Sequence, residues 1–228
     1  MKFNKCFDYV ELDVETLPNG VRHYISPTGE RLPSVTTILS ATKDMTQLHE
    51  WRKRIGDEKA DREVKEAQGV GNLMHKHVED HILGVERTRK SNFVHSLAYD
   101  MAENIINRGL IFCDEIWGVE IPVYFPGAYA GRSDLIGVYK GKPAIMDHKN
   151  SKKMKKREWL EDYRLQGCAY ALAHNELYNT NINQVVLFMS ARDLSYETFV
   201  FEGLDFHNGA DEWIKRLEQY FEMQEKIK

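Results

Sequence analysis

Apolar residues recur along the first half of the chain in short alternating runs and then at helical spacing. Residues 7–14 and 21–26 alternate as two short strands would, and Pro18, Asn19 and Gly20 between them are typical of a turn. From residue 33 onward the spacing becomes that of amphipathic helices. Pro33 and Ser34 open the first of four predicted helices, which cover residues 33–39, 47–55, 57–83 and 92–108.

Strand-like runs replace the helical spacing in the second half. Three apolar segments follow one another closely at 118–125, 129–139 and 143–149. The pattern then predicts one helix, two strands and a final helix, at 157–178, 184–190, 196–202 and 207–226. This order indicates an α/β protein, of α+β character, in which helices flank a mixed central sheet.

No repeat, linker or low-complexity tract interrupts the pattern. We therefore expect a single domain over residues 1–228, with strands and helices at 1–112 and the core at 113–228. The 228 residues are enough to bury a full core, and 42% of them are hydrophobic. Three widely spaced cysteines without a CxxC pair argue against a zinc ribbon or an iron–sulfur cluster.

The sequence contains no sign of a membrane segment. No apolar run approaches the roughly 20 residues of a membrane span. The N-terminus also lacks the apolar core of a signal peptide. We therefore expect a soluble, cytoplasmic protein that acts as a monomer and has no membrane partner.

Two acidic residues and a lysine stand on neighbouring predicted strands. Asp134 lies in the segment 129–139, and Asp147 and Lys149 lie on the next strand. Alternation places Asp147 and Lys149 on one face, whereas His148 is expected to point away. Adjacent strands bring Asp134 close to Asp147. Two such carboxylates predict a site for Mg²⁺ or Mn²⁺, which can activate water for attack on a phosphodiester, while the lysine stabilises the developing charge.

The D/E-x-K triplet alone is weakly specific. It also occurs at 57–59 and 63–65, inside a charged helix, and a surface salt bridge is its structural alternative. Two pairs of residues at i, i+4 spacing on predicted helices add to it, namely Gln166 with Tyr170 and His75 with Glu79. Each pair by itself is an ordinary polar helix edge, so the interpretation depends on all of these features together.

The order of these motifs resembles a known family. GxxxHxxxE on a helix, a strand glutamate, GxxD, DxK and QxxxY follow one another as in the RecB-type branch of the PD-(D/E)XK nucleases. The chain is more similar still to the mitochondrial genome maintenance exonuclease family and its phage-encoded relatives, through LPSVTTILS at 32–40, the segment 129–151 and WIKRLEQY at 213–220. The similarity extends over about residues 20 to 222, nearly the whole chain.

The resemblance implies a restriction-endonuclease-like core beneath an N-terminal helical arch that admits a threaded single strand. It implies that Asp134, Asp147 and His75 bind Mg²⁺ or Mn²⁺, with the backbone carbonyl of His148 as a further ligand. Lys149 would be the catalytic lysine. The residues that would complete or support the site are Gln166, Tyr170, Glu120 and Glu79. Many relatives have an apolar or aromatic residue in place of His148, and since this side chain is expected to face away, we expect little effect on the site.

A basic run follows the metal strand directly. Residues 149–157 read KNSKKMKKR, with six basic side chains in nine, although the formal net charge of the chain is −4. Beside a metal site these charges favour contact with nucleic-acid phosphates over a merely solvated loop, and aromatic side chains can stack on unpaired bases. The predicted DNA contacts are Lys152, Lys153, Lys155, Lys156, Arg157 and Trp159, with Tyr163 and Trp51 as further stacking candidates.

These features predict a metal-dependent exonuclease that hydrolyses single-stranded DNA from a free end, with partners in replication or recombination. Three alternatives stay open. A structure-specific flap endonuclease would share the site, and a non-catalytic DNA-binding protein would share the basic run. A zinc hydrolase would use the cluster of His75, His77 and His81, although the HExxH order is absent.

Overall fold

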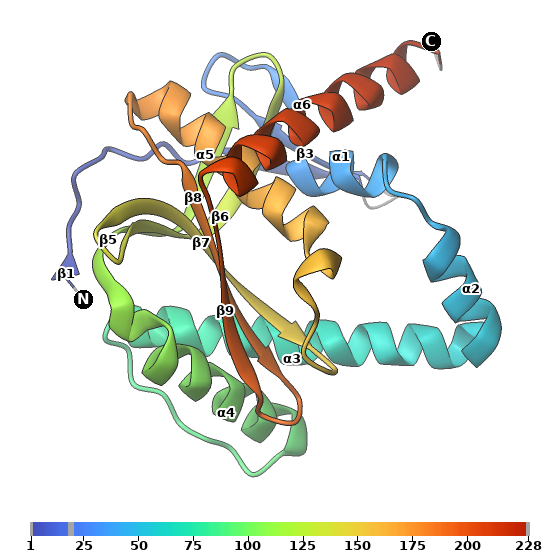
Figure 1. Cartoon of the computed structure of the whole chain (residues 1–228), viewed down its shortest axis with the longest axis vertical. Coiled ribbons are helices and arrows are strands. Elements are labelled where there is room, and N and C mark those ends of the chain that lie inside the picture. Colours follow the sequence, from blue (N-terminus) through green and yellow to red (C-terminus); the bar gives the residue numbers. More distant parts are fainter. Residues whose placement is uncertain (1, 18–20, 227–228) are drawn as a thin grey trace.

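The computed structural model describes residues 2–17 and 21–226 (Figure 1). Its main sheet has six strands in the order β1-β5-β6-β7-β8-β9. The sheet is mixed. β5 pairs with β6, β6 with β7, and β8 with β9 in antiparallel fashion, whereas β1 pairs with β5 and β7 with β8 in parallel. The strands are β1 Lys2–Phe3, β5 Cys113–Phe125, β6 Tyr129–Tyr139, β7 Lys142–Ser151, β8 Gln184–Ala191 and β9 Tyr196–Glu202.

Helices cover both faces of this sheet (Figure 1). One face is covered by α3 (Asp57–Ile82) and α4 (Phe93–Arg108), and the other by α1 (Val35–Ala41), α5 (Glu161–Tyr178) and α6 (Leu204–Glu225). α2 (Thr46–Ile55) connects α1 to α3 along one side of the molecule. Each face has its own buried core, and the mixed α/β architecture predicted from the sequence pattern is confirmed.

The centre of the sheet is buried on both sides. All eight residues of β8 are buried, as expected for a strand that pairs in parallel with β7 and is covered by helices on both faces. α5 packs closely on this strand, because a methyl group at Gly167 would lie only 2.3 Å from Val185. This close packing fixes the position of the polar residues that α5 presents toward β7.

A smaller antiparallel sheet packs beside β6. It consists of β2 (Asp13–Thr16), β3 (Arg22–Ile25) and β4 (Arg31–Pro33). A small apolar cluster joins it to β6 through Leu12, Tyr24, Leu32 and Ala130. Ser34 follows β4 directly and caps α1, since its Oγ accepts a hydrogen bond from the Thr37 N–H at 3.0 Å.

The structure confirms the six predicted helices and corrects several ends. The predicted helix at 157–178 begins only at Glu161, after a 3₁₀ turn at Arg157–Trp159, and the final helix begins earlier, at Leu204. The short strands β1 and β4 were not predicted. The predicted turn at Pro18, Asn19 and Gly20 lies outside the described residues.

The first predicted strand is wrong in position. Pairing begins at Asp13, whereas residues 7–12 are not in a strand. Aromatic contacts hold this segment instead: the Phe7 ring lies 5.0 Å from His174, and the Tyr9 ring 5.2 Å from Tyr178. None of the helices in the described part of the chain is both long and apolar enough to span a membrane.

Candidate metal centre

Strands β6 and β7 separate where the predicted site begins. Their pairing ends at Leu135 opposite Met146, one position before Asp134 and Asp147. Beyond this point the Asp134 carboxylate replaces a partner strand, because its Oδ2 accepts a hydrogen bond from the backbone N–H of His148 at 2.9 Å. The separation of the strands thus gives Asp134 a fixed place beside β7.

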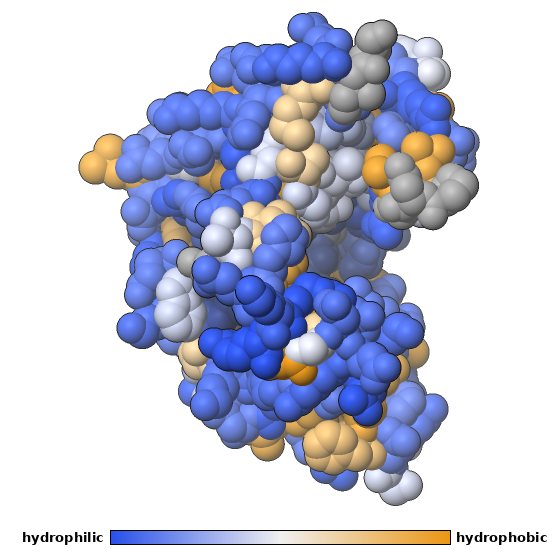
Figure 2. Space-filling model, turned by 90° about the vertical axis from the view of Figure 1, so that its right-hand side faces the viewer, coloured by the Kyte–Doolittle hydropathy of each residue, from blue (hydrophilic) through white to orange (hydrophobic). Residues whose placement is uncertain are grey.

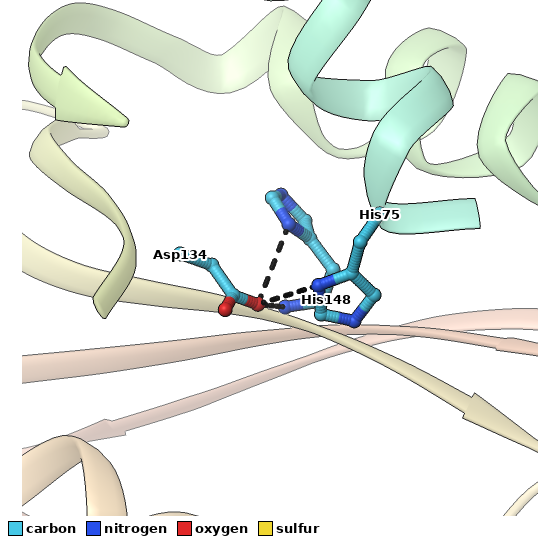
Figure 3. Close-up of side chains that lie close together, drawn as sticks. All are labelled: His75, Asp134 and His148. Atoms are coloured by element: carbon cyan, nitrogen blue, oxygen red, sulfur yellow. Dashed lines mark hydrogen bonds and ion pairs between the residues drawn. The ribbon is translucent and has the colours of Figure 1, made fainter. Parts of the chain in front are cut away.

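Two imidazoles lie close to the Asp134 carboxylate (Figure 3). Nδ1 of His75, from α3, lies 3.3 Å from Asp134 Oδ2, and Nδ1 of His148 lies 3.6 Å from the same oxygen. One potential ligand atom from each of the three residues lies within 4.8 Å of the other two. Among the described residues this is the only such group that could hold a metal ion.

The expectation that His148 faces away from the site is therefore wrong. Alternation along β7 does hold, because the His148 ring stacks on Phe188 at 5.8 Å, on the side of the sheet that α3 and α4 cover. However, α3 brings His75 to that same side, with 5.6 Å between the centres of the two imidazole rings. The site thus receives side chains from both faces of β7.

The other side of β7 carries a chain of polar contacts to α5. The Lys149 ammonium lies 2.7 Å from Asp147 Oδ2 and donates to Gln166 Oε1 at 3.3 Å. The Gln166 amide in turn donates to the Tyr170 hydroxyl at 3.1 Å. Gly131 makes room for this tyrosine, since a methyl group there would lie 2.4 Å from the Tyr170 ring. The structure thus brings together four of the predicted site residues, Asp147, Lys149, Gln166 and Tyr170.

Negative charge is concentrated around the two aspartates. Burial raises the pKa of Asp147 to about 6, although the ion pair with Lys149 opposes this shift. Repulsion from the Asp134 carboxylate contributes to the same rise in the pKa of Asp147. Burial alone would lower the pKa of Lys149, but the Asp147 and Asp134 carboxylates outweigh it and raise that pKa. The ammonium therefore stays charged beside Asp147.

Glu120 lies on the strand next to Asp134. β5 and β6 pair at Val119 with Leu135 and at Ile121 with Ser133, which places Glu120 opposite Asp134. Burial, followed by repulsion from Asp134, raises the pKa of Glu120 to about 7. Glu120 also takes a positive φ of 53°, which is costly for a residue with a side chain.

A cleft of about 920 Å³ opens over these residues. Its walls come from α3, from the end of β7, from α5 and from the small N-terminal sheet, and in the space-filling view the face toward α2 is hollowed between its upper and lower parts (Figure 2). The predicted site residues that line it are His75, Glu79, Glu120, Asp134, His148, Lys149, Gln166 and Tyr170. Asp147 is 5% exposed and is not among the lining residues, so it lies behind Lys149.

The predicted basic run is divided between two surfaces. Lys152 and Lys155 line the cleft, and Lys155 also donates to the Tyr163 hydroxyl at 2.9 Å. Arg157 lines a separate pocket of about 370 Å³, where it pairs with Asp205 at 2.6 Å. Three further predicted contacts are exposed outside the residues that line the cleft, namely Lys153, Lys156 and Trp159.

The lining of the cleft also includes residues that the sequence did not single out. Arg22 and Arg132 line the same cleft as Lys152 and Lys155, and Arg132 donates to the Glu120 carbonyl. Of the predicted stacking residues, Tyr163 lines the cleft and Trp159 and Trp51 do not, and Lys149 and Lys155 lie 4.8 and 4.6 Å from the Tyr163 ring centre. Neither arginine was a predicted site residue, although Arg22 lies in the predicted strand at 21–26 and Arg132 lies within the GxxD motif.

The histidine cluster of the zinc-hydrolase alternative does not form a site. The His77 ring packs on Tyr99 at 5.2 Å. Within the described ranges, neither His77 nor His81 belongs to the group around Asp134 that could hold a metal. The i, i+4 spacing of these two histidines on α3 therefore gives no support to that alternative.

Comparison with known proteins gives no family. No family model matches the chain, and no curated protein matches it either. The crystal structure of a protein named SSO0001 aligns with 67% of this chain and 85% of its own length, at 15% sequence identity and a TM-score of 0.34. A similarity at that level identifies neither the fold family nor the activity.

Proposed function

We propose that this protein is a metal-dependent exonuclease of the PD-(D/E)XK type that hydrolyses single-stranded DNA from a free end. The observation that carries the proposal is the placement of Lys149, whose ammonium lies 2.7 Å from Asp147 and 3.3 Å from Gln166 at the base of a cleft. If the ion pair between Lys149 and Asp147 served stability alone, its lysine would not need to line a cleft. It would also not need a second carboxylate, Asp134, where β6 and β7 separate.

The donor set fits a divalent cation. Asp134 and Asp147 would hold it, with His75 from α3 and the backbone carbonyl of His148 as further ligands. The raised pKa of Asp147 and of Glu120 reflects uncompensated negative charge in a poorly solvated place, which a cation would relieve. When bound, Mg²⁺ or Mn²⁺ would supply Lewis acidity toward a phosphate oxygen and would activate water for attack on phosphorus.

The chain's own residues divide the remaining work. Lys149 donates hydrogen bonds to the phosphate oxygens on which charge develops. Gln166 holds the ammonium in position, and Tyr170 holds Gln166, so the direction of the lysine is fixed before the substrate arrives. Glu79 and Glu120 line the same cleft as outer groups beside the ligands.

The substrate class follows from the cleft's other contacts. Lys152, which pairs with Glu63 at 3.1 Å, and Lys155 line the cleft and would neutralise backbone phosphates. Tyr163 offers a ring on which an unpaired base can stack. α2 and the neighbouring ends of α1 and α3 would form the arch through which a strand is threaded. An opening bounded in this way favours a single strand with a free end over a duplex.

End dependence is the property that separates this proposal from the flap endonuclease. Linear and circular single-stranded DNA of the same sequence would be incubated with the protein and Mg²⁺ or Mn²⁺. The proposal expects loss of the linear strand and survival of the circle. Cleavage of the circle at a similar rate would favour the endonuclease, and binding without cleavage of either would favour a non-catalytic DNA-binding protein.

A further inference from the structure

The His148 imidazole is a buried polar ring without a hydrogen-bond partner. Within the described chain, its Nε2 is buried with no partner, and its side chain is only 4% exposed. Its Nδ1 lies 3.6 Å from Asp134 Oδ2, which is longer than a hydrogen bond. Buried polar groups are nearly always partnered, so the missing partner of Nε2 is unusual. The other ring nitrogen, Nδ1, is the one on the side of Asp134.

The position of Nδ1 suits an ion. The nearest potential ligand atoms belong to Asp134 and His75, and all three atoms lie within 4.8 Å of one another. Two ligands about 2.1 Å from one cation lie at most about 4.2 Å apart, and the two separations that involve Asp134 Oδ2, 3.3 and 3.6 Å, are within that limit. The three side chains come from β7, β6 and α3, so the fold rather than one local motif brings them together (Figure 3).

We propose that the His148 imidazole is a direct ligand of the divalent cation and makes the site prefer Mn²⁺ over Mg²⁺. The inference rests on the proposed function in that it concerns the same cation. Carboxylate, carbonyl and water oxygens suit Mg²⁺, whereas imidazole nitrogen favours transition metals. With His75 and His148 both contributing nitrogen, the site has a softer ligand set than two aspartates would give alone.

The competing explanation is packing. The His148 ring stacks on Phe188 at 5.8 Å, and a phenylalanine could make the same contact. Packing requires only a flat ring, whereas ligation requires a nitrogen atom that faces Asp134. The substitution His148→Phe separates the two, because it keeps the ring and removes the nitrogen.

The test is pulsed EPR of Mn²⁺ bound to the full chain without DNA, which detects ¹⁴N atoms coordinated to the metal. The wild type, His75→Gln and His148→Phe would be compared, with His49→Phe as a control on the exposed surface of α2. We expect imidazole ¹⁴N coupling in all four proteins, and its loss when His75→Gln and His148→Phe are combined. In His75→Gln the remaining coupling would come from His148, so its absence there would overturn the inference even if His148→Phe failed to fold.

Calorimetric titration of the same proteins gives the selectivity. His148→Phe should lower the affinity for Mn²⁺ by about 10-fold or more and the affinity for Mg²⁺ by much less, whereas His49→Phe should change neither. Equal losses for the two cations would contradict the proposed preference. Mn²⁺ binding without a His148 nitrogen would overturn this inference alone, whereas no binding by the wild type would also overturn the proposed metal-dependent function.

Discussion

The backbone N–H of His148 donates a hydrogen bond to Asp134 Oδ2 at 2.9 Å, just beyond the last paired residues of β6 and β7. Asp134 therefore serves two purposes. Its carboxylate replaces the pairing that β6 no longer provides, and it presents the same group to His75 and the cleft.

Replacing Asp134 should separate these purposes. Asp134→Asn keeps an oxygen that can accept from His148, so the free energy of unfolding should stay close to that of the wild type while Mn²⁺ affinity falls. Asp134→Ala leaves the N–H unpaired, and unfolding should become easier by about 1–3 kcal/mol. Urea unfolding and metal titration measure the two effects, and equal destabilisation by both changes would show that the hydrogen bond does not support the strand.

Glu120 should make the metal-free protein less stable as the pH rises. Its folded pKa of about 7 lies above the ordinary value of 4.5, so between these values the folded state binds more protons than the unfolded state. The free energy of unfolding must then fall as the pH rises through this window. In EDTA, Glu120→Gln should weaken this dependence, whereas Glu222→Gln on the exposed surface of α6 should not. Identical pH profiles for wild type and Glu120→Gln would contradict the raised pKa.

The two surfaces of the basic run should differ in DNA binding. Lys155→Ala removes a cation from the cleft, so the affinity for single-stranded DNA should fall and the slope of log K against log salt should flatten by about 0.7. Arg157→Ala changes a side chain that already pairs with Asp205 outside the cleft, and should leave both quantities nearly unchanged. Fluorescence anisotropy at several salt concentrations measures them, and an equal loss in the two variants would show that the strand does not follow the cleft.

Close packing at Gly131 should make it intolerant of a side chain. The added methyl group of Gly131→Ala would lie 2.4 Å from the buried Tyr170 ring and should cost about 1–3 kcal/mol. Gly69→Ala is the matched control, because a methyl group there meets nothing within 4 Å and should stabilise α3 by about 0.5–1 kcal/mol. Urea unfolding compares them, and a neutral Gly131→Ala would mean that Tyr170 has room to move.

The sequence was sufficient to predict the helices, the long strands of the main sheet and the contact between β7 and α5. Helical spacing located the six α-helices of the described residues, and strand alternation correctly put Asp147 and Lys149 on one side of β7, where Lys149 contacts Gln166. Helical spacing and strand alternation are local patterns, because each depends on the residues of a single helix or strand.

The rest depended on what packs on the far side of the sheet. The His148 side chain was expected to face away because alternation turns it from Lys149, and alternation cannot say that α3 places His75 on that side. The DNA contact of Arg157 stays a prediction, but the sequence did not reveal that a 3₁₀ turn begins there and that Asp205 of α6 pairs with it. Both of these contacts join residues that are far apart in the sequence.

The most direct test of the account is the degradation of a linear single-stranded oligonucleotide, labelled at either end, with Mg²⁺, Mn²⁺ or EDTA. Wild type, Lys149→Ala and Lys59→Ala would be compared, since Lys59 ends a second D-x-K triplet, on the exposed surface of α3. We predict metal-dependent loss of the strand by the wild type and by Lys59→Ala. For Lys149→Ala we predict a rate of degradation that is lower by about 100-fold or more. Activity of Lys149→Ala within a few-fold of the wild type, or no cleavage by the wild type with either cation, would contradict the account.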